Sequence, residues 1–495
     1  MGVVIRQSIK ATVVNYVGVF IGFLVQMFVV VKFLPQEVFG LTSVLLNAAL
    51  MFCSFAQLGA GSSIVRFFPY FKNEEKKHNG FFFYLVTVPL IGTLVFGGLF
   101  LLLKEPIADY FQANSELFVE YYYWVLPLGC FLLYTAVFET YSAVLMRIAM
   151  PKLVKEIFLR ILLAAVYILY GFRLITLSQF IACFVGIYGV VMLAIFYYVS
   201  RIGPVSLKHD PAFVGKKLRK DFFSYTSLIV IGSLGGTLIS KVDTFMVSSN
   251  LGLEYAAVYT LAFYMVAVIE IPSRSISTIS GPVASEALKK GDFRKANTLY
   301  KQVSLHQLVA GSIIFILVWV NIDNIYAIIP NGADYRAGKW VFFFVGLAKL
   351  VEVTLSFGGT LISYTKYYHW TIYFAFFITA LTIFSNNLLI PIYGVLGAAL
   401  ATAITCLVSY SIQQWIIFVK IKGNPYTLGT LKQIGIILLL AGVDRLLPVF
   451  ANPWIDGIYR TLVIAVVASA LIYFGKVSPE INRLVNKVVS SVWKR

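Results

Sequence analysis

Four cations lie inside stretches of the sequence that are otherwise apolar, namely Arg160, Lys241, Arg274 and Lys349. An ionisable side chain at membrane depth is costly unless it is paired or hydrated, so such residues usually face a cavity, a partner or a ligand. Three of the four have a carboxylate one helical turn away. These are the pairs Glu156–Arg160, Glu270–Arg274 and Lys349–Glu352. Each pair has two possible interpretations. The two charges can neutralise each other so that the helix can insert into the membrane, or they can form a charged surface that binds a ligand.

Lys241 is different, because the residues three and four positions away carry no carboxylate. Asp243 is only two residues away and points to another side of a helix. An ammonium at this depth needs an anion from another helix, a water-filled cavity or an anionic substrate. A pyrophosphate suits it, since lysine is an effective point charge for phosphate.

The same stretches supply two sets of candidate site residues. The candidates for binding an anionic substrate are Lys241, Arg274, Lys349 and Arg160. The candidates for a coupling ion or a proton are Asp243, Glu139, Glu270 and Glu352. Asp243 and Glu139 belong to the second set because neither has a cation on its own helix face, although Glu139 also fits an interfacial position.

The elements that hold these residues are predicted transmembrane helices. A bilayer core needs about 20 apolar residues of helix, and the chain of 495 residues is 59% hydrophobic with a mean hydropathy of +0.84. Fourteen runs are long enough: 12–33, 41–61, 80–103, 117–143, 153–172, 176–199, 222–249, 255–280, 303–322, 338–362, 368–390, 395–419, 431–449 and 458–474. The predicted fold class is therefore an all-α polytopic membrane protein.

Basic residues gather in every second gap between these runs. With the N-terminus in the cytoplasm, the inner gaps hold roughly four times as many Lys and Arg residues as the outer gaps, as the positive-inside rule requires. The sequence thus predicts fourteen spans with both termini cytoplasmic. The net charge of +18 follows from this bias and from attraction to an anionic leaflet, so nucleic acid is not an expected partner.

Several classes of protein are disfavoured by features that the sequence lacks. The four cysteines all lie in predicted spans and the four histidines are scattered, which gives no disulfide framework, zinc site or other metal site. There is no phosphate-binding loop and no soluble domain, so no ATPase and no nucleotide cofactor are expected. The short outer gaps also argue against a membrane glycosyltransferase or polymerase, and the chain is predicted not to be an enzyme.

A faint internal repeat predicts two lobes. The outer turns at 33–41 and 250–259 each carry one glutamate, and the helix pairs that follow them end at Pro69 and Pro282 before basic stretches. The longest inner gap, 201–221, is the predicted linker. The expected division is an N-terminal six-helix lobe at 1–207, a second six-helix lobe at 208–426, two additional spans at 427–476 and a cytoplasmic tail at 477–495.

At this level the chain resembles the oligosaccharide-repeat-unit flippases of the polysaccharide biosynthesis family, within the multidrug/oligosaccharidyl-lipid/polysaccharide exporter superfamily. The resemblance covers nearly the whole length through short motifs in a fixed order. They are Leu34-Pro35-x-x-x-Phe39-Gly40, Leu58-Gly59-Ala60-Gly61, Arg66, Lys241-Val242-Asp243-Thr244, Leu251-Gly252, Tyr259, Glu270-Ile271-Pro272 and Pro391-Ile392-Tyr393-Gly394 with Val395-Leu396-Gly397-Ala398-Ala399. It implies two pseudo-symmetric six-helix bundles around a central cavity, plus two C-terminal helices.

The resemblance also implies a function, which is flipping of polyprenyl-pyrophosphate-linked oligosaccharide from the inner to the outer leaflet of a bacterial cytoplasmic membrane for polysaccharide export. We expect alternating access, coupled to a proton or sodium gradient or driven by consumption of the flipped product. Expected partners are the lipid-linked substrate, membrane lipids and polysaccharide assembly proteins. Alternatives on the same fold are an ion-coupled exporter of amphiphilic drugs and a peptidoglycan-precursor flippase.

The tail carries a separate signal. Seven apolar residues from Ile481 to Trp493 fall on one helical stripe, with Arg483, Lys487, Lys494 and Arg495 around it, after a start signal at Ser478-Pro479. This pattern predicts an amphipathic helix on the inner membrane surface, with docking against a protein partner as the alternative.

Overall fold

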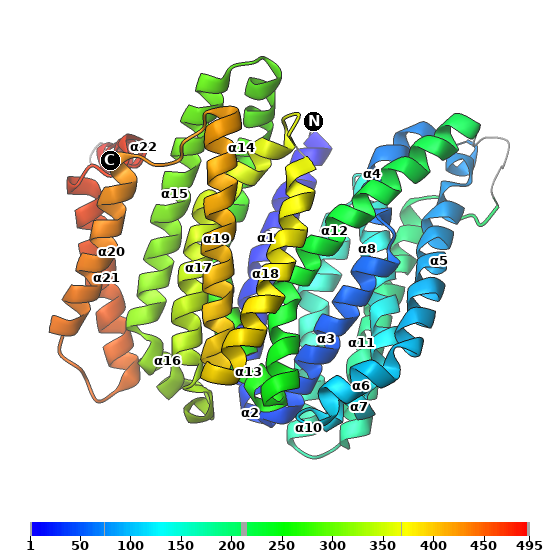
Figure 1. Cartoon of the computed structure of the whole chain (residues 1–495), viewed down its shortest axis with the longest axis horizontal. Helices are drawn as coiled ribbons and strands as arrows, with labels where there is room; N and C mark the ends of the chain where they lie inside the picture. The colour runs from blue at the N-terminus through cyan, green and yellow to red at the C-terminus, as the bar shows by residue number, and fades with distance from the viewer. Residues whose placement is uncertain (1, 74, 209–214, 368, 493–495) are drawn as a thin grey trace. The chain divides into compact units, whose positions relative to one another are not determined.

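The computed structural model describes residues 2–73, 75–208, 215–367 and 369–492, and within these ranges the side chains of 227–240 and of scattered other residues are outside the description. All regular secondary structure in the described ranges is helical (Figure 1). The chain divides into two compact units, 1–260 and 261–495. The predicted linker at 201–221 lies partly outside the described residues, and the predicted lobe boundaries stay predictions.

The first unit is built from helices that reach to α12. They are α1 (Gly2–Leu24), η1 (Val25–Val30), α2 (Val31–Phe33), α3 (Gln36–Ala56), α4 (Ala60–Phe71), η2 (Lys77–Gly80), α5 (Phe81–Leu102), α6 (Lys104–Gln112), α7 (Glu116–Glu120), η3 (Tyr122–Trp124), α8 (Val125–Val144), α9 (Ala149–Leu153), η4 (Val154–Phe158), α10 (Leu159–Gly171), α11 (Leu177–Ile202) and α12 (Lys216–Leu251). Helix α13 (Leu253–Ala267) crosses the boundary between the units.

The second unit contains the rest of the chain. Its elements are η5 (Val268–Glu270), α14 (Ile271–Lys289), α15 (Phe293–Val320), α16 (Ile322–Ile328), η6 (Gly332–Tyr335), α17 (Gly338–Ser363), α18 (His369–Tyr393), α19 (Val395–Ile421), α20 (Leu428–Leu446), α21 (Pro453–Phe474) and α22 (Pro479–Val492). Within it α17 packs against both α15 and α19.

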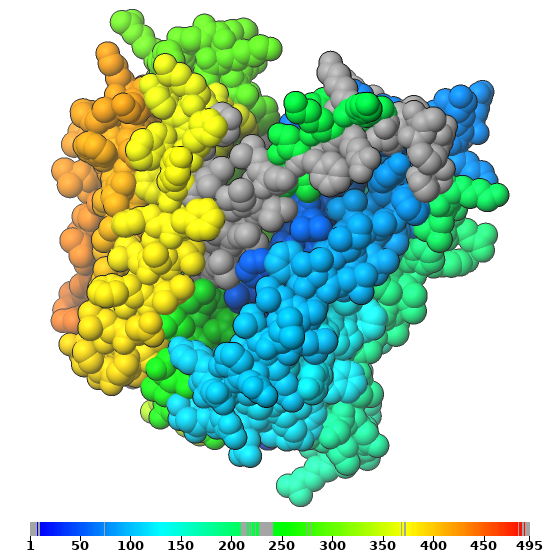
Figure 2. Space-filling model, turned by 45° about the vertical axis from the view of Figure 1, so that its right-hand side comes forward, coloured from blue at the N-terminus to red at the C-terminus, as the bar shows by residue number. Residues whose placement is uncertain are grey.

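The prediction of an all-α polytopic membrane protein is confirmed. Eleven helices in the described residues are long and apolar enough to cross a membrane, and they match eleven of the fourteen expected spans. The other three, 153–172, 222–249 and 431–449, correspond to α9–η4–α10, α12 and α20. Large apolar side chains also remain exposed, as on α5 (light blue in Figure 2), where Leu94 and Leu102 are 68% and 82% exposed. Such a surface suits contact with lipid chains.

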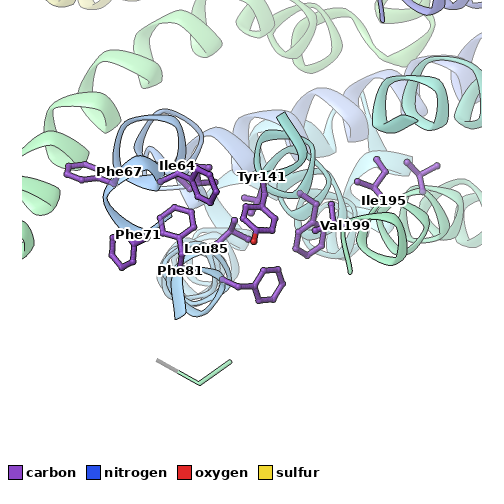
Figure 3. Close-up of a cluster of buried hydrophobic side chains, with 14 residues drawn as sticks. Ile64, Phe67, Phe71, Phe81, Leu85, Tyr141, Ile195 and Val199 are labelled. Carbon is purple, nitrogen blue, oxygen red and sulfur yellow. The ribbon is translucent and has the colours of Figure 1, made fainter. Parts of the chain in front are cut away.

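Buried side chains, many of them aromatic, form a core cluster in the first unit (Figure 3). Phe67 and Phe71 of α4 lie beside Phe81 of α5, and Tyr141 of α8 completes the cluster with Val199 of α11. The rings of Phe71 and Phe81 are 5.0 Å apart, within the range in which aromatic pairs attract each other. This packing fixes α4, which in turn contacts α12.

Two π-helical segments interrupt the helices of the first unit. They are η1, within the first predicted span, and η4, within the fifth. η1 packs against α10 and η4 packs against α1. Because π-helical turns change the direction in which side chains leave a helix and are frequent at functional sites, the position of Glu156 within η4 bears on the charged residues described next.

Candidate functional site

In the second unit, four of the predicted site residues form one connected cluster. Nζ of Lys349 lies 2.8 Å from Glu352 and 3.7 Å from Glu270, and Nε of Arg274 lies 3.3 Å from the other oxygen of Glu270. The expected pairs Glu270–Arg274 and Lys349–Glu352 are therefore confirmed. The sequence did not indicate that Lys349 joins them into one network.

Helix geometry explains how this cluster forms. Glu270 ends the short 3₁₀ segment η5, which packs against α15 and α17, so its carboxylate reaches Lys349 while Arg274 follows one turn later on α14. Lys349 lies eleven residues into α17, about 16 Å from its start at 1.5 Å per residue. The Lys349 side chain is 13% exposed and that of Arg274 is 64% exposed. Two cations and two carboxylates neutralise each other within this cluster, with Arg274 at its accessible end.

In the first unit, the Glu156–Arg160 pair is confirmed and lies against α1. Nη2 of Arg160 is 2.8 Å from Glu156. A Cβ atom on Gly18 would come within 2.6 Å of Glu156, and one on Gly22 within 2.6 Å of Arg160. Two glycines four residues apart thus give the ion pair its place beside α1. This packing favours a structural role for Arg160.

Glu139 has a partner that the sequence did not reveal. Its carboxylate lies 2.9 Å from Nζ of Lys155, and the two side chains are 23% and 40% exposed. Lys155 belongs to η4, whereas Glu139 is on α8. The rule for pairs within one helix finds no cation for Glu139 because its cation belongs to another element of the chain.

Asp243 also has a partner from another helix. Its Oδ2 accepts a hydrogen bond of 3.0 Å from the hydroxyl of Tyr259 on α13, and the two residues are 7% and 1% exposed. Tyr259 was part of the family resemblance, but no pattern within one helix connects it with Asp243. The hydroxyl fixes one carboxylate oxygen in a largely water-free site.

Lys241 stands apart from the other cations. It is half-buried on α12, ten residues before the end of that helix, which is about 15 Å at 1.5 Å per residue. No carboxylate lies within ion-pair distance of it in the part of the chain that the structure describes, whereas Arg160, Arg274 and Lys349 are all paired there. The sequence predicts that Lys241 has no carboxylate partner on its own helix. Among the described residues of other helices, the structure shows none either.

One buried charged cluster was missed. Arg460 lies 2.7 Å from Asp456 and also contacts the carboxylate of Asp444, and the side chains of Arg460 and Asp456 are 9% and 3% exposed. Asn324 of α16 donates a hydrogen bond of 2.6 Å to Asp456. The cluster joins α16, α20 and α21. The four-residue spacing of Asp456 and Arg460 indicated an ion pair in the sequence. This pair was not predicted because the two residues lie next to an outer loop.

No group of three or more histidine, cysteine, aspartate or glutamate side chains in the described ranges is arranged to hold a metal ion. The described site residues form ion pairs and the Asp243–Tyr259 hydrogen bond, and the ammonium of Lys241 has no ion-pair partner among them. Such groups bind and orient charged molecules.

Comparison with known proteins identifies the class to which this arrangement belongs. The family model described as "Polysaccharide biosynthesis protein" matches residues 4–287, more than half of the chain, so the chain belongs to this family. A relative from Methanocaldococcus jannaschii, described as uncharacterized membrane protein MJ1068, is 24% identical over 290 residues, which are 58% of this chain and 55% of that protein. The chain thus matches about half the length of this relative.

Solved structures share the fold. The structure of Lipid II flippase MurJ in an inward closed conformation has a TM-score of 0.70 at 15% identity, with 96% of this chain and all of that chain covered. An inward-facing multidrug resistance MATE family transporter of the MOP superfamily has a TM-score of 0.62 at 13% identity, covering 82% and 94% of the two chains. A MOP superfamily transporter from Pyrococcus furiosus gives 0.55 at 13%, covering 85% and 96%. The predicted family and fold are confirmed.

Proposed function

We propose that the protein flips a polyprenyl-pyrophosphate-linked oligosaccharide from the inner to the outer leaflet of a bacterial cytoplasmic membrane for cell-surface polysaccharide export. The observation that carries this proposal is Lys241, a half-buried ammonium with no ion-pair partner among the described residues. A pyrophosphate supplies the missing anion, and its charge-assisted hydrogen bonds to an ammonium are about twice as strong as neutral ones.

The cluster around Lys349 is assigned a supporting role. Its charges balance one another, so it stays neutral without substrate. Arg274, at 64% exposure, is the member that can turn from Glu270 toward an arriving anion at a small cost, because exposed ion pairs contribute little to stability. Lys349 and Arg160, which are better buried, would then act mainly by holding helices in place.

Coupling to an ion gradient is assigned first to Asp243. Of the four acidic candidates, Glu139, Glu270 and Glu352 are partly exposed, at 23%, 31% and 38%. Asp243 is buried, at 7% exposed, and the hydroxyl of Tyr259 donates a hydrogen bond to its carboxylate, so a proton or a sodium ion bound there would be shielded from water. The bound cation would be exchanged as the transport cycle proceeds.

Alternating access requires that contacts of α12 change during the cycle. Near the start of α12, Thr226 lies 3.0 Å from Ser63 of α4, and the guanidinium of Arg66 lies 4.1 Å from the ring centre of Tyr225. Near its end, Asn114 donates a hydrogen bond of 2.8 Å to the carbonyl of Ser249. We expect the cycle to break these two groups of contacts alternately, since α12 begins the second lobe of the predicted repeat.

A binding experiment tests the proposal. Purified protein is titrated with a short-chain polyprenyl pyrophosphate disaccharide and with the matching monophosphate. The wild type should prefer the pyrophosphate, Lys241→Ala should bind it about tenfold to a hundredfold more weakly, and Lys241→Arg should keep part of the affinity, since hydrogen bonds to charged groups contribute roughly 1.5–3 kcal/mol. Lys290→Ala, which removes an exposed cation, is the control and should bind normally.

The same titration separates the alternatives. Unchanged affinity of a stably folded Lys241→Ala variant would contradict the proposal. Binding of an amphiphilic cationic dye in place of either lipid would favour the drug exporter. Comparison of sugars on the same pyrophosphate would distinguish a peptidoglycan precursor from another oligosaccharide, because Lys241 suits both.

A further inference from the structure

The C-terminal helix α22 is fixed to the second unit at its first turn. Nε2 of Gln302 on α15 donates a hydrogen bond of 2.9 Å to Glu480, and the hydroxyl of Ser478 donates one of 2.8 Å to the other carboxylate oxygen. The ring of His306 lies 3.1 Å from the same hydroxyl. Four side chains from α15 and the start of α22 thus form a compact polar joint.

A second set of contacts orients the helix beyond this joint. Asn482 donates a hydrogen bond of 2.8 Å to the carbonyl of Tyr473, and the Tyr473 hydroxyl donates one of 2.7 Å to Asn486. Ile481 packs against the buried cluster that includes Leu305 of α15. Helix α22 therefore lies at the ends of α20 and α21, as Figure 1 shows, and one of its sides is occupied by the protein.

The remaining described face of α22 is basic and open. Arg483 and Lys487 are exposed, stand one turn apart and have no ion-pair partner among the described residues. Ser490 is also exposed and lies three residues after Lys487 on the same side of the helix, whereas Val485, two residues from each cation, lies on the opposite side. Of the predicted tail, Trp493, Lys494 and Arg495 lie outside the described residues.

We infer that this face of α22 is a docking surface for acidic phospholipid headgroups, which Arg483 and Lys487 bind. Charge complementarity commits the surface to this occupant: the helix directly follows the last membrane span, on the side that the distribution of Lys and Arg predicts to be cytoplasmic, where the leaflet is acidic. Basic residues that directly follow a membrane span are attracted to such surfaces. Because Glu480 is hydrogen-bonded to Gln302 of α15, headgroup binding to α22 would also fix the position of α15 and α21 relative to the membrane plane.

The inference depends on the chain crossing a membrane and not on what it transports. It is tested with the full chain in lipid nanodiscs. The four native cysteines (Cys53, Cys130, Cys183 and Cys406) are replaced, and a fluorophore is attached at Ser490→Cys, on the basic face. Quenching by the neutral solute acrylamide is then compared in nanodiscs of phosphatidylcholine alone and of phosphatidylcholine with increasing phosphatidylglycerol.

The expected result is that quenching falls as phosphatidylglycerol is added and returns in concentrated salt, which screens the attraction. The double variant Arg483→Ala/Lys487→Ala should weaken the lipid-dependent association about thirtyfold, because each basic residue near an acidic leaflet contributes roughly fivefold. The control Lys289→Ala/Arg294→Ala removes two exposed cations outside α22 and should behave as the wild type.

Equal quenching in neutral and acidic nanodiscs would overturn the inference, whether the probe is shielded in both or accessible in both. Shielding in both would indicate a protein contact or neutral lipid over α22. If the double variant does not fold, the salt dependence of the wild-type signal decides the question, since a headgroup contact must weaken with ionic strength and an apolar contact must not.

Discussion

Replacing Lys349 and Lys241 separately by methionine should affect stability in opposite ways. Lys349→Met removes the cation between Glu352 and Glu270, which lie 2.8 and 3.7 Å from it, and leaves two carboxylates facing each other. Breaking a fully buried pair costs about 3–5 kcal/mol. Because these carboxylates are 38% and 31% exposed and water screens them in part, we expect a loss of about 1–3 kcal/mol.

Lys241→Met removes a cation that has no partner among the described residues. A lysine at the centre of a membrane helix costs about 2.5–3.5 kcal/mol on insertion scales, and partial hydration of a half-buried side chain reduces this cost. The free energy of unfolding should therefore stay the same or rise by up to about 1 kcal/mol, while substrate binding weakens about tenfold to a hundredfold. A lysine that is retained for ligand binding lowers the stability of the protein when no ligand is bound.

Thermal unfolding of the purified variants in detergent, followed by size-exclusion chromatography, measures this contrast. The matched control is Lys290→Met, whose exposed pair with Glu286 should contribute little. Adding Glu352→Gln to Lys349→Met should restore part of the lost stability. A Lys241→Met variant as unstable as Lys349→Met would refute the reasoning, because it would mean that Lys241 neutralises an anion of the protein itself.

Three further outcomes follow from the structure. Gly40→Ala should lower the stability by about 1–3 kcal/mol in the same unfolding assay, because its Cβ would meet the carbonyl of Leu253 directly, whereas Gly98→Ala, with nothing within 4 Å, should be neutral or stabilising. Arg460→Leu should cost about 3–5 kcal/mol, since it leaves two carboxylates without their cation; a stable variant would show that those carboxylates are protonated or hydrated. Burial alone would raise the pKa of Glu480, but hydrogen bonds to its carboxylate outweigh this and hold the pKa below its ordinary value of 4.5. A lowered pKa means that the joint of α22 is stabilised above pH 4.5 and loses this contribution as the pH falls through the lower folded-state value, so proteolysis of α22 should accelerate there and not between pH 6 and 8.

The pairs within single helices could be predicted because helix periodicity alone places residues three and four positions apart on one face. Glu156–Arg160, Glu270–Arg274 and Lys349–Glu352 were found in this way, and all three form. The family and the fold were also predicted, since the distribution of Lys and Arg and the order of short motifs do not depend on how helices pack.

Contacts between helices could not be predicted from one sequence. Glu139 meets Lys155, Asp243 meets Tyr259 and Lys349 meets Glu270 only because particular helices are neighbours. Glu156, in the π-helical segment η4, and Arg160, just after it, lie beside Gly18 and Gly22 of α1, and no periodicity of apolar residues indicated the π-helical segment. Arg460 lies at the outer end of the predicted span 458–474, and its cluster with Asp444 and Asp456 could not be predicted because hydropathy does not distinguish a buried ion cluster from a polar helix end.

The central claim is that Lys241 serves the movement of a lipid-linked pyrophosphate across the membrane. It is tested most directly in liposomes that carry a fluorescent polyprenyl-pyrophosphate oligosaccharide, by measuring how fast headgroups become accessible on the other side with and without a proton or sodium gradient. We predict rapid, gradient-sensitive movement for the wild type and for Lys290→Ala, and none above protein-free liposomes for Lys241→Ala. Equal rates for folded wild type and Lys241→Ala, or no movement by the wild type while a cationic dye is extruded, would contradict it.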